Sequence, residues 1–502
     1  MIENIRRHRT ALIVLLAALV ASCATVHGTA TEPQLRTDLA AKIDTIVQAR
    51  LDAFLIPGAV VAVSDPERGS YIHAYGTADV ETGRASAVDD HFRIGSITKT
   101  FTATAVLRLA DEGKLTLDDS LSKFVDGVPN GDAITLRNLL GMRGGVYDYT
   151  SDPEFAEHYF ADPQTPGWKA TDGLRIIRAH PDKATAPDKA TVYNNAEYYL
   201  LGLVIEKVTG TPARDVINDL MADLGLKNSS YPAGSAVPAP ASHGYKYVYD
   251  VQTDVTASTP PSEFTAAGAA ISTVGDLLKY GKLLATGTLL KPETHAARTQ
   301  FTSLGEGADY GLGLFDMSGW LGHGGDVLGY STAVYYLPEH DATIAVAVNR
   351  YDPGLTLPEG ADSIFRAIAE ELYADSMPRE GDSVTSPPTP DAVSLNADLQ
   401  EALDPTIAAR TKTLRVKGDE KDPELITQVA NAFADAQQTV QVDRVTDLGG
   451  GRLAATVTVA LADGHKTPSV IGFVADDGEW KISQGWACYI TSAQATPSPA
   501  CV

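Results

Sequence analysis

One stretch of the sequence divides the chain into two parts that must fold around separate cores. Between Met377 and Ser394 it holds four prolines among Ser, Thr and Asp residues and almost no side chain that could be buried. Such a composition is typical of a semi-rigid linker. The sequence therefore predicts a large unit over residues 37–376, a linker over 377–394 and a small unit over 395–502. A chain of 502 residues is long enough for two cores.

The first residues have the pattern of an export signal. Three arginines within residues 6–9 precede an unbroken apolar run from Ala11 to Ala21, which is too short to span a bilayer as a mature helix. The run ends in Val20-Ala21-Ser22-Cys23, which resembles the lipobox of bacterial lipoproteins. We expect a signal peptide over 1–22, a lipid on Cys23, a polar tether over 23–36, and an exported protein anchored to the outer face of the bacterial cytoplasmic membrane. An ordinary secretory signal with an incidental cysteine is the alternative.

Charge and cysteine content narrow the class of protein. The net charge of −24 argues against a phosphate backbone as partner, so we expect no binding to nucleic acid. Besides Cys23 the chain contains only Cys488 and Cys501, an even pair that suggests a disulfide in an exported protein. Two free thiols are the alternative. The sequence has no Cys-x-x-Cys and no His-Glu-x-x-His, so no metal and no cofactor are expected.

The large unit shows helical spacing of apolar residues near both of its ends and strand-like segments between them. Helices at both ends that enclose antiparallel strands indicate an α+β fold whose sheet is covered by helices. The expected elements are a helix over 37–54, a hairpin of strands over 60–63 and 71–75, a long helix from Gly95 to Gly113, strands over 332–337 and 343–349, and a helix starting near Asp362.

A candidate nucleophile opens the long helix. Ser96 and Lys99 are three residues apart, which places hydroxyl and amine on one helix face, and the helix N-terminus adds backbone N–H groups where an oxyanion would develop. A Ser-x-x-Lys match alone is weak, and a second one runs from Ser120 to Lys123. That second match lies in a polar stretch and is expected to be a surface loop. The first follows Phe92-Arg93-Ile94-Gly95 and opens a largely apolar helix, where a solvated lysine is less expected.

Two further motifs lie far from Ser96 in the chain. Tyr193-Asn194-Asn195 is the only Tyr-x-Asn, and His323-Gly324-Gly325 is the only His-x-Gly. Taken singly, Tyr193 could be a core residue and His323 part of a loop. Together with other blocks they resemble the serine β-lactamase/D-alanyl-D-alanine carboxypeptidase superfamily, on its class C side. The other blocks are Ile56-Pro57-Gly58-Ala59, Asp111–Leu115, Ile134–Leu140, Tyr199–Gly202, Ser272–Asp276 and Tyr310–Gly313.

The resemblance implies a penicillin-recognising serine hydrolase fold, which combines a helix-covered antiparallel sheet with an all-helical subdomain, and an acyl-enzyme mechanism. Ser96 would be the acylated nucleophile, Lys99 would stabilise the serine or accept its proton, and Tyr193 would be the second proton-transfer group. Burial beside another cation would disfavour a charged Lys99, and a nearby ammonium would favour a tyrosinate at Tyr193. The sequence leaves open which of the two holds the proton.

The remaining site residues would position the substrate. By the same resemblance, Asn195 would orient Lys99 or a substrate amide, and the strand that starts at His323 and includes Gly325 would line the cleft beside a substrate carboxylate. The backbone N–H groups of Ser96 and Asp326 would form the oxyanion hole. The substrate would be a peptidoglycan-like peptide, a β-lactam or an ester, as for a D-alanyl-D-alanine carboxypeptidase or β-lactamase-like enzyme of the cell envelope. An esterase, or a catalytically weak binding or regulatory lipoprotein, is the alternative.

Two departures from the pattern of relatives matter for the substrate. The sequence has Gly141-Met142-Arg143-Gly144-Gly145 where Ser-His-Thr-Ser-Gly is common, so the loop near the cleft is uncertain. It has His323-Gly324-Gly325 where many relatives have Lys-Thr-Gly, so a fixed positive charge and a threonine hydroxyl are missing. Recognition of a carboxylate as strong as in a dedicated β-lactamase is therefore not expected, and peptidases and esterases are favoured.

The small unit offers no comparable site. Asp422-Pro423 predicts the start of a helix, and strands are expected over 440–445, 452–461, 469–475 and 480–485. The unit resembles the low-molecular-weight secreted antigens of mycobacteria, at Leu395 to Asp404 and at Trp480 to Ser483. That resemblance implies a small α+β fold of the nuclear-transport-factor or cystatin type, an actinobacterial cell envelope, and a role in spacing or in binding an envelope partner.

Overall fold

The computed structural model describes residues 34–160, 167–248, 251–305, 308–351, 360–377, 386–491 and 498–501. The expected signal peptide, Cys23 and most of the polar tether lie outside the described residues. Among those that are described, no helix combines the length and the apolar character needed to cross a membrane.

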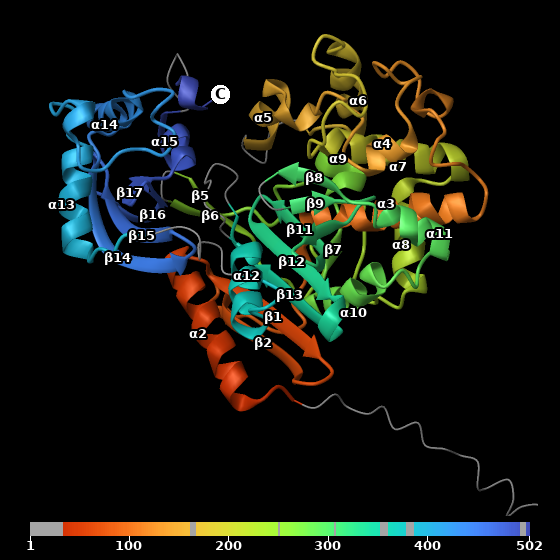
Figure 1. Cartoon of the computed structure of the whole chain (residues 1–502), viewed down its shortest axis with the longest axis horizontal. Coiled ribbons are helices and arrows are strands. Elements are labelled where there is room, and N and C mark those ends of the chain that lie inside the picture. Colours follow the sequence, from red (N-terminus) through yellow and green to blue (C-terminus); the bar gives the residue numbers. More distant parts are fainter. Residues whose placement is uncertain are drawn as a thin grey trace, which may run out of the picture.

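A nine-stranded antiparallel sheet forms the centre of the large unit (Figure 1). Its central strands are buried on both faces, and alternate residues serve different cores. Val60 and Ala62 belong to one core, whereas Ala59, Val61 and Val63 belong to the other. The order is β3 (Arg84–Ala85), β2 (Gly69–Asp79), β1 (Gly58–Asp65), β13 (Ala342–Val348), β12 (Tyr330–Leu337), β11 (Trp320–Val327), β10 (Phe315–Met317), β9 (Ala308–Tyr310) and β8 (Thr302–Gly305).

Helices cover both faces of this sheet, as expected for strands that are apolar on both sides. The terminal helices α2 (Thr37–Ala53) and α12 (Ala361–Leu372) pack together on one face, and α10 (Val274–Ala285) packs on the other (Figure 1). The second face also joins a helical subdomain. Its helices are α3 (Thr98–Asp111), α4 (Leu136–Leu140), α5 (Pro153–Phe160), α6 (Ala170–Ala179), α7 (Asn195–Thr209), α8 (Ala213–Asp223), α9 (Pro261–Phe264) and α11 (Pro292–Arg298).

Two short ribbons and several 3₁₀ turns complete the large unit. The ribbons pair β4 (Phe92–Arg93) with β7 (Ile271–Ser272) and β5 (Tyr245–Val248) with β6 (Val251–Asp254). The 3₁₀ turns are η1 (Gly95–Ile97), η2 (Leu121–Lys123), η3 (Tyr149–Ser151), η4 (Thr265–Ala267) and η5 (Pro338–His340).

The small unit has its own core and its own four-stranded antiparallel sheet. A disulfide joins Cys488 to Cys501, whose Cα atoms are 5.5 Å apart. The helices are α13 (Ala392–Ala402), α14 (Leu425–Asp435) and α15 (Gln484–Thr491), and the strands are β14 (Thr439–Gly449), β15 (Arg452–Ala460), β16 (Lys466–Asp476) and β17 (Glu479–Ile482), with 3₁₀ turns η6 (Ala409–Thr411) and η7 (Pro499–Cys501).

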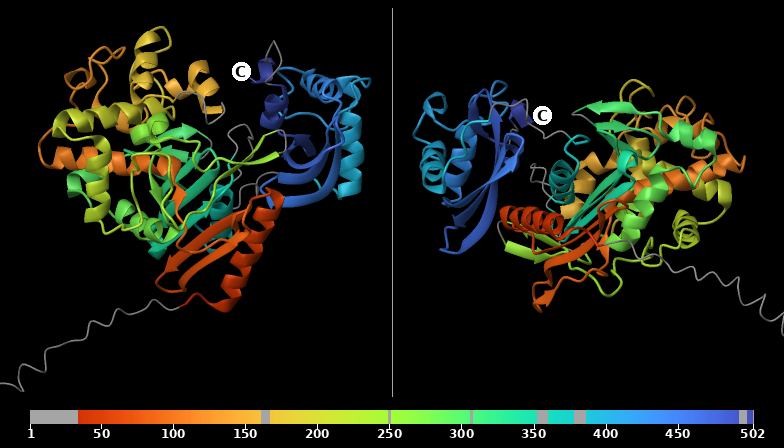
Figure 2. Two further views of the ribbon diagram at one scale, coloured as in Figure 1. Left: turned by 180° about the vertical axis from the view of Figure 1, so that it is seen from behind. Right: turned by 60° about the horizontal axis from the view of Figure 1, so that its bottom comes forward.

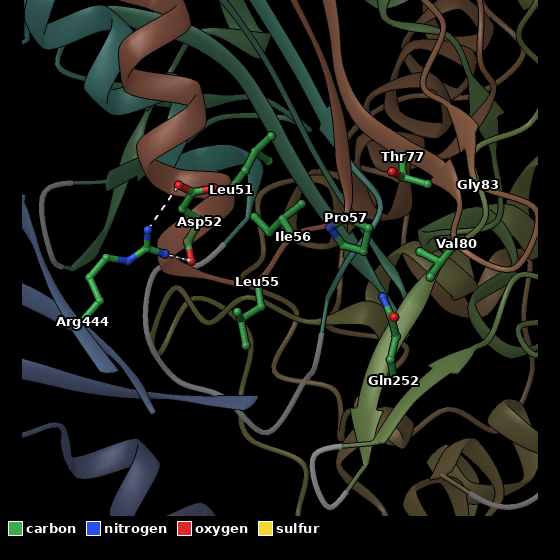
Figure 3. A pocket seen from close by; sticks show the side chains of 10 residues that line it. All are labelled: Leu51, Asp52, Leu55, Ile56, Pro57, Thr77, Val80, Gly83, Gln252 and Arg444. Atoms are coloured by element: carbon green, nitrogen blue, oxygen red, sulfur yellow. Dashed lines mark hydrogen bonds and ion pairs between the residues drawn. The ribbon is translucent and has the colours of Figure 1, made fainter. Parts of the chain in front are cut away.

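The two units meet at the C-terminal end of α2, which contacts β14 and β15 (Figure 2). The Arg50 guanidinium donates to the carbonyl oxygen of Leu448, and Arg444 pairs with Asp52. An open pocket of about 570 Å³ lies beside this contact, between Leu55, Val80 and Arg444 among others (Figure 3). None of the expected catalytic residues lines it, so this pocket is separate from the candidate active site.

The structure corrects four expected boundaries. The long helix is preceded by a 3₁₀ turn that contains Ser96, so the regular helix starts only at Thr98. Helix α14 begins at Leu425 rather than at Pro423, because Asp422 caps the backbone N–H of Glu424 and the chain turns once more before the helix. Strand β17 ends at Ile482, since the residues from Gln484 onward form α15. Helix α13 begins at Ala392, inside the expected linker, with Asp391 as its N-cap.

Candidate active site

Ser96 lies on the tight turn η1, between the end of β4 and the start of α3. The turn depends on Gly95, which has φ +46° and lies against strand β11: a methyl group on Gly95 would be 2.7 Å from both the N and the O atom of Asp326. Any other residue would be strained there and would collide with the strand. Ser96 is partly exposed while Thr98 and Lys99 are fully buried, so the turn presents the serine hydroxyl at the surface of a packed site.

The Lys99 ammonium nitrogen makes three hydrogen bonds at the centre of the site. Lys99 Nζ lies 2.9 Å from Ser96 Oγ, 2.7 Å from Asn195 Oδ1 and 2.9 Å from the carbonyl oxygen of Ala267. Burial lowers the pKa of Lys99 to about 7, and the nearby Asp148 carboxylate opposes this shift. The expected second cation plays no part, because desolvation alone disfavours the charged amine. A neutral amine can donate to Asn195 and Ala267 and present its lone pair to the Ser96 hydroxyl.

Tyr193 lies close enough to Ser96 for a hydrogen bond between the two side chains to affect its pKa. The Lys99 nitrogen is 4.8 Å from the centroid of the Tyr193 ring. Burial raises the pKa of Tyr193 well above its usual value, and the hydrogen bond with Ser96 opposes this shift only in part. Burial therefore outweighs any favourable effect of a neighbouring ammonium on a tyrosinate, and of the two groups Lys99 is the one whose pKa lies near neutrality.

Asn195 accepts a hydrogen bond from the lysine and is itself fixed by Asp148, which precedes η3, and by Thr150 within η3. Its backbone N–H donates to Asp148 Oδ2 at 2.9 Å, and its side-chain amide donates to Thr150 Oγ1 at 3.0 Å. Asp148 Oδ1 in turn accepts from the Thr150 hydroxyl at 2.8 Å. Because both amide donor and acceptor are engaged, the Asn195 side chain has one orientation, with its oxygen directed at Lys99.

The 3₁₀ turn η1, which contains Ser96, contacts strand β11 next to Asp326, where the oxyanion hole is expected. A methyl group on Gly325 would be 2.0 Å from the Ile94 carbonyl oxygen and 2.9 Å from Ser96 N, so only glycine allows this approach. The backbone N and O atoms of Asp326 lie close to Gly95, the residue before the serine. The backbones of Ser96 and Asp326 are therefore close together, and the oxyanion hole formed by their N–H groups stays a prediction.

His323 lies in an aromatic cluster rather than at the surface of a cleft. The residue is 1% exposed, and its ring contacts the rings of Tyr193, Tyr310 and Phe315. Its Nε2 atom is 3.2 Å from the Tyr310 hydroxyl. Burial lowers the pKa of His323 to about 3, so the ring is neutral at physiological pH. The His323 ring therefore packs against the Tyr193 ring. Because it is neutral, it does not replace the positive charge that the lysine of Lys-Thr-Gly supplies in many relatives.

We expect His323→Ala to destabilise the protein, because it leaves a cavity among three aromatic rings. The free energy of unfolding should fall by about 2–4 kcal/mol, as for other large-to-small changes in a core. Urea denaturation measures this directly. His465→Ala is the matched control, since that side chain is 81% exposed in a turn and its loss should change stability by less than about 0.5 kcal/mol. Equal stabilities of the two variants would contradict the buried role.

The second Ser-x-x-Lys lacks such surroundings. Ser120 precedes η2 and bonds to Ser122, while the Lys123 side chain is 58% exposed and pairs with Asp119. Three residues that complete the first site were not predicted from the sequence, namely Asp148, Thr150 and Ala267. Asp148 and Thr150 follow shortly after the Gly141–Gly145 loop, whose role near the cleft the sequence left uncertain. Ala267 contributes only its backbone carbonyl oxygen, so its residue type could not reveal the contact. In the described part of the chain, no three His, Cys, Asp or Glu residues form a metal-binding group.

Comparison with known proteins shows the family of each unit. Residues 43–368 match the family model "Beta-lactamase", and residues 388–498 match "Low molecular weight antigen MTB12, C-terminal domain". Penicillin-binding protein 4* of Bacillus subtilis is 24% identical over 303 residues, a match that spans 56% of this chain and 65% of the relative, which is less than two thirds of its length.

Solved structures share the fold of the large unit. A D-stereospecific amidohydrolase from a Streptomyces species is 29% identical, with a TM-score of 0.57, over 66% of this chain and 98% of its own. The hydrolase EstCE1, described as having promiscuous acyltransferase activity, shares the fold at 21% identity and a TM-score of 0.54, over 67% of this chain and 98% of its own.

Proposed function

Because the chain belongs to the beta-lactamase family of serine hydrolases, we propose that it cleaves amide or ester bonds through an acyl-enzyme on Ser96. One observation carries the proposal: Lys99 Nζ lies 2.9 Å from Ser96 Oγ in a buried setting that brings the pKa of the lysine to about 7. A serine hydroxyl is a weak nucleophile, and a neutral amine at this distance is the base that activates it.

The steps follow from the positions of the groups. Lys99 accepts the Ser96 proton as the oxygen attacks the substrate carbonyl, and the backbone N–H groups of Ser96 and Asp326 stabilise the oxyanion. Tyr193, which is protonated at this stage, gives its proton to the leaving amine or alcohol and regains one from the Lys99 ammonium, so both groups return to their starting protonation states. The acyl group remains on Ser96 until water, activated by the same groups, releases it.

The finer choice of substrate lies between a peptide or β-lactam and a simple amide or ester. A carboxypeptidase or β-lactamase activity of the cell envelope would need to hold a substrate carboxylate, and the neutral, buried His323 offers no charge for it. The likeness to the amidohydrolase and to EstCE1 supports an amidase or esterase. A catalytically weak binding lipoprotein is disfavoured by the complete Ser96, Lys99 and Tyr193 arrangement.

A substrate panel tests the proposal. The purified protein should react with a fluorophosphonate probe and should hydrolyse a chromogenic ester or anilide. Cleavage of a penicillin or of a D-alanyl-D-alanine peptide in preference to these would place the activity on the carboxypeptidase side. Absence of both labelling and turnover would leave the binding-lipoprotein alternative.

We also propose that the protein is exported and lipid-anchored through Cys23. Metabolic labelling with an alkyne fatty acid should mark the native chain, and Cys23→Ser should remove the label because the acylated thiol is gone. Equal labelling of the Cys23→Ser variant would contradict the anchor and favour an ordinary secretory signal. The small unit, positioned on α2, would then bind an envelope partner or act as a spacer.

A further inference from the structure

Glu197 carries a buried carboxyl group that the proposed acyl-enzyme route does not use. It is the third residue of α7 and is 1% exposed. Burial raises the pKa of this carboxyl group well above its usual range, although hydrogen bonds from the backbone N–H groups of Gly144 and Gly145 lower it. Burying a carboxyl group costs free energy unless its oxygens are hydrogen-bonded, so the contacts of Glu197 indicate what it holds in place.

The carboxyl group of Glu197 does not cap its own helix. A glutamate three residues after an N-cap ordinarily reaches back to the backbone N–H of the N-cap residue. In this helix the backbone N–H of the N-cap, Asn194, donates to the Met142 sulfur at 3.3 Å instead. The Asn194 side chain accepts from the Glu197 N–H at 3.3 Å and donates to the Val146 carbonyl oxygen at 2.7 Å. The Glu197 carboxyl group is therefore available for contacts outside the helix.

Glu197 contacts the α4–η3 loop, which comprises residues 141–148. Its Oε1 atom accepts a hydrogen bond from the Gly145 N–H at 3.0 Å. A methyl group on Gly144 would be 2.8 Å from the same oxygen, so the glycine leaves room for the carboxyl group. Both glycines belong to the segment that stands where Ser-His-Thr-Ser-Gly is common in relatives. This loop is therefore held by a carboxyl group that needs a glycine opposite it.

The same loop leads into the groups that orient Asn195. Asp148, three residues after Gly145, accepts from the Asn195 backbone N–H at 2.9 Å, and the Thr150 hydroxyl accepts from the Asn195 amide at 3.0 Å. The Asn195 oxygen in turn accepts from the Lys99 amine at 2.7 Å. A displacement of the loop would therefore reach the Lys99 amine through Asn195.

We infer that Glu197 is a positioning residue for acylation, which holds the α4–η3 loop and thereby fixes Asn195 against the Lys99 amine. The inference rests on the proposed acyl-enzyme function. The action of Glu197 is indirect, because its hydrogen bonds go to the backbone of the loop and to Asn194. A misplacement of about 1 Å in a reacting group can cost about 10²-fold in rate, so an indirect effect of this kind is measurable.

A double-mutant cycle tests the inference. Stopped-flow kinetics with 4-nitrophenyl acetate give the acylation rate constant of the full-length wild type, Glu197→Ala, Asn195→Ala and the double variant. Glu197→Ala alone should lower this rate constant by about 10- to 100-fold. In the Asn195→Ala background the same substitution should cost less than about 3-fold, because the group through which Glu197 acts is already absent. Equal costs in the two backgrounds would overturn the inference.

Two further variants separate positioning from a loss of stability. Glu197→Gln keeps an acceptor oxygen for the Gly145 N–H and has the size and donor capacity of a protonated carboxyl group, so it should retain most of the wild-type rate. Val204→Ala truncates a fully buried side chain about two turns further along α7, so it should lower the midpoint of urea unfolding and keep the wild-type rate. A Glu197→Gln variant as slow as Glu197→Ala, or an equally slow Val204→Ala variant, would contradict the positioning role.

Gly144→Ala replaces Glu197→Ala in the cycle if the latter does not fold. Its methyl group would displace the Glu197 carboxyl group from the loop, so it should slow acylation in the wild-type background and have little effect in Asn195→Ala. Fluorophosphonate labelling of wild-type Ser96 together with an additive cycle would overturn the inference and leave the proposed function standing. Failure of this labelling would reject both.

Discussion

Replacing Ser96 with alanine is expected to abolish turnover of every amide and ester substrate, because the covalent route requires the serine oxygen. The loss should exceed that of any other single change at the site. Initial rates with an activated ester measure it. Ser120→Ala is the matched control: it removes the serine of the second Ser-x-x-Lys, whose lysine is exposed and paired with Asp119, and it should retain wild-type rates. A Ser96→Ala variant with substantial activity would reject the assignment.

Replacing Lys99 with methionine should lower the rate of acylation by about 10²–10⁴-fold, the usual contribution of one general base. Methionine has similar length and no amine, so the packing around the site is largely kept. The pH profile gives a sharper readout. Since the pKa of Lys99 is about 7, the wild-type acylation rate should rise through neutral pH and level off above it as the amine loses its proton. This rise should be absent in Lys99→Met.

Tyr193→Phe should also slow acylation by orders of magnitude but should keep the rise near pH 7, because Tyr193 stays protonated throughout that range. Members of one proton relay are not additive. The Lys99→Met/Tyr193→Phe double variant should therefore be little slower than the slower single variant. A pH step that disappears in Tyr193→Phe and persists in Lys99→Met would show that the two roles are the reverse of those proposed.

Much of this site was predictable from the sequence because its chemistry depends on side chains in short motifs. Ser96, Lys99, Tyr193 and Asn195 lie together as the resemblance implied. The fold class was predictable for a similar reason, since β1, β12 and β13 are apolar at most positions and the flanking helices have clear helical spacing.

The protonation states were not predictable, because they depend on burial and on groups brought close by the fold. The pKa of Lys99 falls through desolvation and without a neighbouring cation, and the pKa of Tyr193 rises where a fall was expected. The side chain of His323 points into an aromatic cluster, which a His-x-Gly triplet cannot reveal.

The starts of two helices, α14 and α3, were also predicted wrongly. In both cases a local interaction delays the first turn of the helix. Asp422 bonds to the backbone of Glu424 and delays α14, and Gly95 forces a 3₁₀ turn before α3. In both places a side chain or a positive φ competes with the regular helix at its first turn, where backbone N–H groups lack partners within the helix.

The central claim, that Ser96 forms a covalent acyl-enzyme, is tested most directly by intact-protein mass spectrometry after reaction with an activated ester, followed by peptide mapping. The account predicts one added acyl group, located on the peptide that contains Ser96 and absent from Ser96→Ala. An adduct on any other residue, including Ser120, or an adduct that persists in Ser96→Ala, would contradict it.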